Sequence, residues 1–404
     1  MTAALSTADA ILKEIYEPGI NDQLNNDVVA LRRIERTSEG ITSQVGGKYV
    51  VFPIHVSRNG GIGARREDED LPTAGRQGYR RAQVGLRYQY GRLRLTGQAI
   101  ALANENFQAF ASVMEEEATR VRDDLAKDLN RQVYGNGDGV IATISGALTG
   151  STAPIDSLLW LTEGSVVDTG TINATTGVFT RVASSKLVEN VDVENGTVDL
   201  TGGSGTPVSG HVIVRAGSFR RGTEDNDQRE WTGLGALVGT DPLFGTDHPQ
   251  WRSRVDNNNG SGRALSESLL INNADALRVK GTYPTVMFMN LGVRRAYFNL
   301  LTQQRRYTNT QTFEGGFSGL AFTTDKGDIP MVVDTDCPPG IIYGLNEKQI
   351  KVYRDADWAY MDRDGSRWAR DNNRDAYNAT LFQYSELGTH RRNAHFRIED
   401  IIEA

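Results

Sequence analysis

The sequence has 404 residues, a formal net charge of −7 and a mean hydropathy of −0.44, and it contains no apolar stretch long enough to cross a membrane as a helix. The acidic balance argues against a general nucleic-acid-binding protein, which would need a basic surface. A single cysteine, Cys337, excludes an intrachain disulfide bond, and no cation lies near it in the sequence to activate its thiol as a nucleophile.

The first 48 residues are predicted to form an arm. Ala8–Tyr16 has the pattern of a short helix, Asp27–Glu35 has that of a second, and the polar segment between them shows no periodicity. Charged side chains such as Lys13 stand where a signal peptide would need an apolar block, so we expect synthesis in the cytoplasm.

A long hairpin is predicted after the arm. β-Branched and aromatic residues indicate a strand over Lys48–Val56 and a return strand over Gln83–Thr96. The alternation of the return strand changes phase at Gly91, which predicts a β-bulge there. The connection carries the charged stretch Gly60–Pro72 and has no pattern of its own, and a loop of this length is usually functional or disordered.

The tip of this loop is the candidate functional site. Such a run of charges can be a solvated cluster, but its place at the tip of a hairpin favours a contact with another molecule. We therefore predict a glycine hinge followed by intersubunit contacts. The hinge residues are Gly60, Gly61 and Gly63, and the contact residues are Arg65, Arg66, Glu67, Asp68, Glu69 and Asp70.

One long helix is predicted over Phe107–Tyr134, with Asn104 as its N-cap and Gly135 at its end. Its apolar residues recur at three- and four-residue steps on a single face, so the helix should lie against a sheet. The residues of this face are Phe107, Phe110, Met114, Val121, Leu125 and Leu129.

Residues 140–230 differ from their surroundings, because they are rich in glycine, threonine, valine and serine, and acids outnumber bases. Asn195-Gly196 between two alternating segments is a strong hairpin signal. We expect an inserted all-β unit here. After it, Ser266 is predicted to cap a helix that ends near Gly281, Thr285–Met289 reads as a buried strand before a second helix, and further strands reach the end of the chain.

The sequence offers no convincing catalytic, cofactor or metal site. Arg66 stands where a dinucleotide fingerprint would have its third glycine, and no phosphate-binding loop pattern occurs. The five histidines never pair at the spacing of metal ligands. We therefore expect no enzyme, no cofactor and no metal, although a β-rich hydrolase with paired carboxylates remains an alternative.

The order of these parts resembles the major capsid proteins of tailed bacteriophages, which have the Hong Kong 97-type fold. The hairpin is similar to the E-loop of that family and the long helix to its spine helix. Four segments look like further family features: "YGNGDG" after the spine, "TGLGAL", "YPTVMFMNLGVRRAYFNLL" in the A-domain, and "FSGLAFTTDKGDIPMVV". The resemblance implies an α+β chain with an inserted all-β domain. Its expected parts are an N-terminal arm (1–48), the E-loop (49–97), the P-domain spine (98–139), the inserted domain (140–230), a P-domain continuation (231–264), the A-domain (265–350) and C-terminal P-domain strands (351–404).

The resemblance also implies a function. Copies of the chain would assemble as pentamers and hexamers into an icosahedral shell around double-stranded DNA, which they would bind without sequence specificity. Expected partners are other copies of the chain, a separate scaffolding protein, a portal protein and, as a further candidate, a decoration protein, with no membrane. The protein would reside in the virion and assemble in the host cytoplasm. An encapsulin-like compartment around a cargo enzyme is the alternative. Residues 49–126 contain no lysine, so the E-loop crosslink of some family members is not expected.

Overall fold

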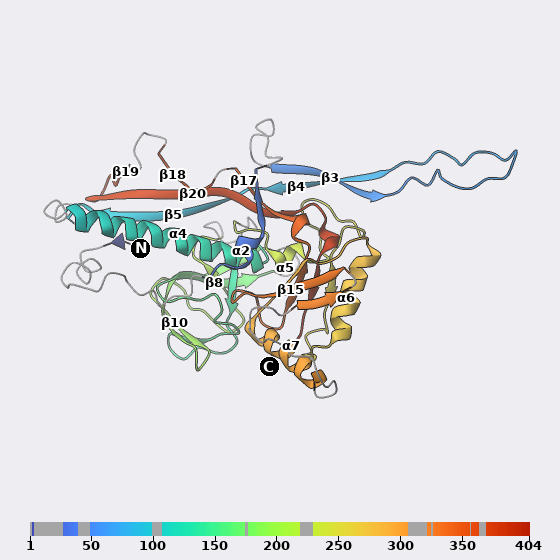
Figure 1. Cartoon of the computed structure of the whole chain (residues 1–404). Coiled ribbons are helices and arrows are strands. Elements are labelled where there is room, and N and C mark those ends of the chain that lie inside the picture. Colours follow the sequence, from blue (N-terminus) through green and yellow to red (C-terminus); the bar gives the residue numbers. More distant parts are fainter. Residues whose placement is uncertain are drawn as a thin grey trace.

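The computed structural model describes residues 2–3, 27–38, 49–98, 107–173, 177–218, 229–305, 321–324, 326–355, 357–362 and 369–404, with side chains in all of these except residues 2–3, 107–116 and 302–305. The helix expected over Ala8–Tyr16 and the cap expected at Asn104 lie outside the described residues. Figure 1 shows a long layer of strands, a body beneath it, and a hairpin that projects far beyond the body.

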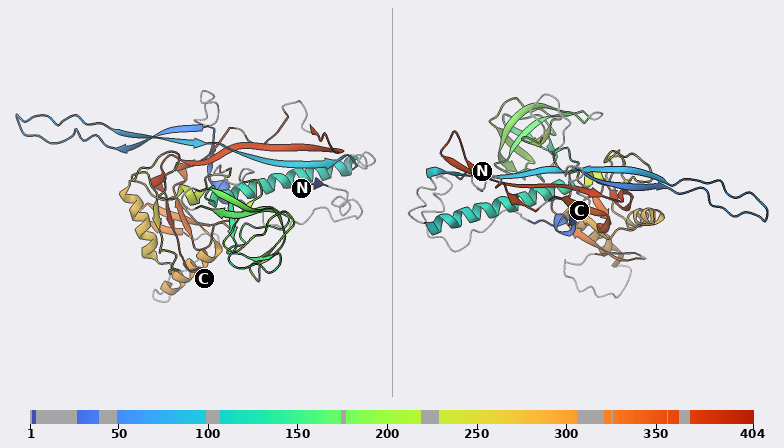
Figure 2. Two further views of the ribbon diagram at one scale, coloured as in Figure 1. Left: turned by 180° about the vertical axis from the view of Figure 1, so that it is seen from behind. Right: turned by 90° about the horizontal axis from the view of Figure 1, so that it is seen from above.

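A seven-stranded sheet forms the long layer. Its strand order is β1-β5-β20-β17-β2, and β18 and β19 also pair with β20. The two longest members, β5 (Arg87–Thr96) and β20 (Ala376–Thr389), pair antiparallel, and α4 (Phe107–Tyr134) runs along them in both views of Figure 2. The other strands are β1 (Thr2–Ala3), β2 (Glu35–Thr37), β17 (Ile350–Arg354), β18 (Ala359–Tyr360) and β19 (Ala369–Arg370).

Gly91 lies within β5 without a β-bulge, so the bulge expected there is wrong. The pairing of β5 with β20 shows no register shift along the whole strand. Gly91 faces α4, and a Cβ at this position would lie 2.5 Å from Cδ1 of Leu125. Glycine is therefore required for the close approach of strand and helix. The single return strand expected over Gln83–Thr96 is also wrong, because it divides at Leu86 into two strands of different sheets.

The predicted long helix is confirmed as α4. Leu129 on its apolar face is 3% exposed and belongs to the central core, whereas Val121 and Leu125 are half-buried near Gly91. The remaining predicted residues of this face lie in the stretch whose side chains are not described: Phe107, Phe110 and Met114.

The predicted hairpin consists of β3 (Tyr49–Ser57) and β4 (Gly78–Gly85), which form a two-stranded sheet of their own. The strands pair from Tyr49 with Gly85 outward to Ser57 with Gly78, with an irregularity near the outer end. The loop between them, residues 58–77, continues away from the body in Figure 1.

Residues 140–215 form a six-stranded antiparallel sheet with its own hydrophobic core. The hairpin predicted at Asn195-Gly196 is confirmed: it joins β9 to β10, Gly196 has φ +65°, and the Asp192 carboxylate accepts hydrogen bonds from the turn. In spatial order the strands are β6 (Val140–Thr143), β11 (Val212–Arg215), β8 (Val166–Ile172), β9 (Phe179–Asp192), β10 (Thr197–Thr201) and β7 (Thr152–Pro154).

A third sheet, also six-stranded, lies beside two helices (Figure 1). The predicted cap is confirmed, since the side chain of Ser266 accepts a hydrogen bond from the Leu269 amide at the start of α6. β21 joins this sheet by pairing with β16, and it does not join the sheet of β20. In spatial order the strands are β12 (Arg254–Asp256), β21 (Phe396–Ile398), β16 (Ile342–Leu345), β13 (Val286–Met289), β15 (Gly327–Val333) and β14 (Ala321–Thr324); the helices are α6 (Glu267–Val279) and α7 (Leu291–Arg305).

A central core joins the long layer to the third sheet. Trp231, which is 1% exposed, packs there with Leu129, Val133 and residues from strands of both sheets. Two short helices contribute to it, α2 (Ala30–Arg33) and α5 (Leu234–Leu237). The described chain also has the 3-10 turns η2 (Glu347–Gln349) and η3 (Arg392–Ala394). The end of α4 is thus fixed from several sides.

Candidate functional site: a projecting hairpin anchored beside the long helix

The hairpin is packed against the body at its root. Val50, Phe52 and Ile54 alternate on the buried face of β3, as expected of a strand with one face covered. They form one cluster with Trp251 and Tyr353 of the body. This cluster fixes the direction in which the hairpin leaves the body.

Polar contacts fix the same root. Nε of Arg87, at the start of β5, lies 3.2 Å from Oε2 of Glu386, and the Thr232 amide donates to Oε1 of that carboxylate at 2.7 Å. The Gln83 amide of β4 donates to the Phe244 carbonyl at 3.0 Å. Burial raises the pKa of Glu386 to about 7. The hairpin root is therefore tied by polar contacts to two separate segments of the chain, at Phe244 and at Glu386.

The three predicted hinge glycines differ in their surroundings. Gly61 lies where the two arms of the loop approach, and a Cβ there would lie 2.7 Å from the backbone nitrogen of Gly75. Its own amide donates to Oδ1 of Asn59 at 2.7 Å. Gly60 and Gly63 have room for a side chain. Close packing of the two sides of the loop thus explains why residue 61 is a glycine. A hinge at Gly60, Gly61 and Gly63 stays a prediction.

The tip is a closed turn of charged residues. The Glu69 amide donates to the Arg66 carbonyl at 3.4 Å, and the Arg66 amide donates to the Glu69 carboxylate at 3.0 Å. Asp68 between them has φ +64°, and Nε of Arg65 donates to the Asp70 carbonyl at 3.0 Å. All six predicted contact residues lie in this loop and are exposed. Within the described part of the chain, none of them contacts the body.

Two large apolar side chains flank this turn and were missed in the sequence. Ile62 is 80% exposed and Leu71 is 85% exposed. Large apolar residues on an otherwise polar, projecting loop are typical of a surface that another molecule covers. Their isolation among charged residues is visible in the sequence and could have indicated the contact.

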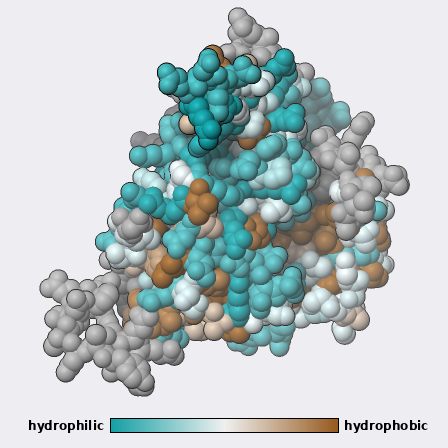
Figure 3. Space-filling model, turned by 90° about the vertical axis from the view of Figure 1, so that its right-hand side faces the viewer, coloured by the Kyte–Doolittle hydropathy of each residue, from teal (hydrophilic) through white to brown (hydrophobic). Residues whose placement is uncertain are grey.

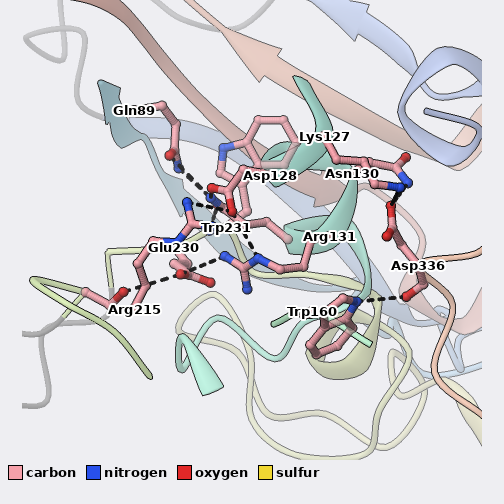
Figure 4. Close-up of polar contacts among 12 residues, drawn as sticks. Gln89, Lys127, Asp128, Asn130, Arg131, Trp160, Arg215, Glu230, Trp231 and Asp336 are labelled. Atoms are coloured by element: carbon pink, nitrogen blue, oxygen red, sulfur yellow. Dashed lines mark hydrogen bonds and ion pairs between the residues drawn. The ribbon is translucent and has the colours of Figure 1, made fainter. Parts of the chain in front are cut away.

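Beneath the long sheet, the side chain of Asn130 in α4 binds both the acidic segment Asp334–Asp336 and Leu31 of the arm (Figure 4). Its Nδ2 donates to Oδ2 of Asp336 at 2.6 Å and to Asp334, and its Oδ1 accepts from the Leu31 amide at 3.1 Å. Nζ of Lys127 lies 2.9 Å from Oδ2 of Asp336. Sequence patterns could not reveal this cluster, because its members lie some 100–300 positions apart.

A second polar cluster joins α4 to residues 215 and 230 (Figure 4). Arg131 is ion-paired with Asp128 at 3.0 Å and with Glu230 at 2.8 Å, and Arg215 reaches Asp128 at 3.0 Å. Although burial opposes ionisation, Arg131 and Arg215 hold the pKa of Asp128 below its ordinary value. The indole Nε1 of Trp160 donates to the Asp336 carbonyl at 3.2 Å, so the antiparallel sheet of residues 140–215 is tied to both clusters.

The buried polar groups bind one another within the chain. The buried carboxylates Asp334 and Asp336 accept hydrogen bonds from groups of the chain itself, including the Ala30 amide. Burial raises the pKa of the Cys337 thiol well above its ordinary value, which makes it a poor nucleophile. Within the described ranges, no cluster of three or more His, Cys, Asp or Glu residues is placed to hold a metal ion, and no helix is long and apolar enough to span a membrane.

Comparison with known proteins agrees with this architecture. A family model described as SU10 major capsid protein matches residues 213–401. A search of curated proteins found no match. Among solved structures, the chain is similar to the "Cyanophage A-1(L) capsid asymmetric unit", with a TM-score of 0.59, 13% identity, and coverage of 98% of this chain and 99% of that chain. A structure titled "Mycobacterium phage Bobi" has a TM-score of 0.47 and 10% identity, covering 98% of each chain. The holo-SrpI encapsulin complex of Synechococcus elongatus PCC 7942 has a TM-score of 0.42 and 7% identity, covering 99% of this chain and 95% of that chain.

The long helix, the projecting hairpin and the likeness to the cyanophage capsid structure show that the chain has the Hong Kong 97-type fold. The match of the SU10 major capsid protein family model over residues 213–401, a little under half of the chain, agrees with this fold.

Proposed function

We propose that the chain assembles as pentamers and hexamers into an icosahedral shell that encloses double-stranded DNA, and that it catalyses no reaction. The observation that carries this proposal is the hairpin. Its root is locked into the body by the cluster around Phe52 and by the Arg87–Glu386 ion pair. Its tip presents charged and apolar side chains that have no partner among the described residues of the body. A contact surface held rigidly away from its own domain suits binding to a neighbouring subunit.

The proposed partners follow from this role. Assembly in the host cytoplasm would use a separate scaffolding protein and a portal protein, and a decoration protein is a further candidate. The net charge of −7 supports a wall against which packaged DNA slides without sequence-specific binding.

We also propose that residues 140–230 are an inserted domain on the outer surface of the shell. The strands of residues 140–215 pair only with one another among the described strands, and they enclose their own core. Contacts such as Arg215 with Asp128 would attach this domain to the spine. β21 supports one change to the expected division, since it assigns residues 396–398 to the A-domain sheet.

Reversal of charge at the tip tests the contact role. Changing Arg65 and Arg66 to Glu should leave the melting temperature of the isolated subunit nearly unchanged, because exposed substitutions usually alter stability by no more than about 0.5 kcal/mol. The yield of sedimenting particles should fall strongly at low salt and recover partly at 1 M salt, where the Debye length is about 3 Å. Changing the exposed Arg370 and Arg374 to Glu is the matched control.

Normal particle yield from the Arg65/Arg66 variant at every salt concentration would show that the tip makes no contact. A large loss of subunit stability would show that these charges act within the fold. Nucleic acid in purified particles separates a viral shell from an encapsulin-like compartment, which would contain a cargo enzyme instead.

A further inference from the structure

Charge is segregated along the hairpin. Between residues 49 and 86 there are six arginines and four acids, a net charge of +2 (6 − 4, with histidine neutral). The four acids are consecutive at the tip, residues 67–70. The two arms on either side, residues 49–64 and 71–86, carry no acid, and we call them the shaft. The shaft carries four exposed arginines: Arg58, Arg76, Arg80 and Arg81.

The shaft arginines have no acidic partner in the part of the chain that the structure describes. Within the described residues, the side chains of Arg58, Arg76 and Arg80 have no ion pair, and Nη2 of Arg81 donates to the neutral Oε1 of Gln83 at 3.4 Å. The shaft therefore presents uncompensated positive charge to the surroundings of the subunit.

The tip has the opposite excess. Glu69 lies 4.0 Å from its neighbour Arg66, but Glu67, Asp68 and Asp70 have no cation bound to their carboxylates within the described part of the chain. Figure 3, which views the molecule from the hairpin side, shows a mainly hydrophilic surface in its upper part. The most exposed apolar side chains of the hairpin, Ile62 and Leu71, flank these acids.

A subunit cannot pair its own tip with its own shaft in this conformation. Ten residues separate Arg58 from Asp68, and an extended chain of that length spans up to about 33 Å. The loop is extended in Figure 1 and does not turn back. The Debye length at physiological ionic strength is about 8 Å, so attraction between these exposed groups within one hairpin is screened.

We propose that the hairpin tip of one copy docks on the hairpin shaft of a second copy. Glu67, Asp68 and Asp70 then oppose Arg58, Arg76 and Arg80 of the neighbour, whereas Arg65 and Arg66 face acids of the neighbour outside its shaft, because the shaft has none. Ile62 and Leu71 cover the ring of Tyr79, which is 63% exposed in the single chain. This contact rests on the proposed function, because it requires copies to assemble. Charge complementarity then sets the register in which neighbouring hairpins lie.

A second copy fits these observations better than packaged DNA does. DNA would satisfy the shaft arginines but would repel the four acids on the same hairpin. A second hairpin supplies both signs of charge and apolar side chains at matching ends. Arginine also forms two-pronged hydrogen bonds with carboxylates, which favours defined pairs over diffuse attraction.

A charge-exchange experiment tests this inference. Two variants each reverse one side of the contact. The tip reversal is Glu67→Arg, Asp68→Arg and Asp70→Arg, and the shaft reversal is Arg58→Glu, Arg76→Glu and Arg80→Glu. Each variant alone should lower particle yield at least about tenfold at low salt, since like charges then meet at every contact. A chain with both reversals should restore the yield to within about threefold of the wild type, because the complementarity returns with exchanged signs. Reversal of the exposed Arg32, Arg370 and Arg374 is the control for total charge.

Each outcome decides the inference. Losses from both single reversals without recovery in the combined variant would overturn it, because the charges would then meet other partners. A shaft reversal that lowers only the nucleic-acid content of intact particles would assign the shaft to DNA and overturn it as well. If the wild-type chain forms no particles under any condition, the proposed function fails, and this result is distinguishable from failed rescue in a chain that assembles.

Disulfide trapping gives a readout independent of yield. The only native cysteine, Cys337, is fully buried. Any disulfide bond between chains should therefore form through the introduced cysteines. Particles assembled from a mixture of Asp68→Cys and Arg76→Cys chains should give a dimer band under mild oxidation. A mixture of Asp68→Cys and Arg370→Cys chains should not. Equal bands from the two mixtures would contradict tip-to-shaft docking.

Discussion

Arg87 and Glu386 form an ion pair across β5 and β20, with Nε of Arg87 3.2 Å from Oε2 of Glu386. The Glu386 side chain is 1% exposed, and it also accepts a hydrogen bond from the Thr232 amide. Arg87 follows the break at Leu86, where the chain leaves the hairpin and enters the long sheet. The pair therefore lies at the point from which the hairpin projects.

The Glu386 carboxyl should make subunit stability depend on pH. Burial raises its pKa from an ordinary value of 4.5 to about 7, so the folded state binds this proton more tightly than the unfolded state does. The resulting stability is fully present below pH 4.5 and is lost as the pH rises through 7, by about 3–4 kcal/mol at about 1.4 kcal/mol per pKa unit. Urea unfolding from pH 4 to pH 8 should show this fall in the wild type and a flatter dependence in Glu386→Gln. The exposed Glu189→Gln change should retain the wild-type slope, and parallel curves for all three would refute the assignment.

Asn130 should be important for holding the arm. Asn130→Ala removes the donor to Asp334 and Asp336 and leaves the buried Leu31 amide without its acceptor. Unsatisfied buried groups cost about 1–3 kcal/mol each, so we expect a loss of about 2–4 kcal/mol in the free energy of unfolding. Proteolysis near residues 27–34 should accelerate in parallel. Asn190→Ala, which removes an exposed amide contact to Asp199, should have little effect; equal losses would show that the buried cluster has no special role.

Gly91 should not tolerate a side chain. In Gly91→Ala the new Cβ would lie 2.5 Å from Cδ1 of Leu125, so the strand or helix must shift at a cost of about 1–3 kcal/mol. Adding Leu125→Ala should make the first change less costly, because it removes the clashing atom. Gly60→Ala is the control, since nothing lies within 4 Å of its Cβ position. Thermal unfolding of the single and double variants measures the coupling, and additive losses would contradict the contact.

The sequence predicted those elements whose signals are local. The periodicity of α4, the cap at Ser266 and the turn at Asn195-Gly196 each depend on residues close together in the chain, and each is confirmed. The charges at the hairpin tip were located in the same way, although their contact role stays a prediction.

The interpretation of β5 failed for a physical reason. Tyr88 and Tyr90 alternate with smaller or polar residues in the sequence, which led to the expected change of phase at Gly91, but they are 53% and 52% exposed. Tyr88 packs edge-on against Tyr384 of β20, with ring centroids 4.9 Å apart, on the face away from α4. Aromatic rings stabilise an exposed sheet face through such cross-strand pairs, so their hydrophobicity does not reveal which face is buried.

The shell should contain no covalent crosslink through the hairpin, because residues 49–126 include no lysine. Particles boiled in denaturant should run as one band near 44.4 kDa. A ladder of subunit multiples that survives reducing agent would contradict this prediction.

The central claim is that the chain forms a closed shell through contacts between projecting hairpins and neighbouring subunits. Electron cryomicroscopy of particles produced by expressing the chain with its neighbouring genes tests this claim most directly. We predict icosahedral shells of pentamers and hexamers in which residues 58–77 of every subunit cross onto an adjacent copy. A protein that stays monomeric at high concentration under these conditions, or shells in which the hairpin folds back onto its own body, would contradict the account.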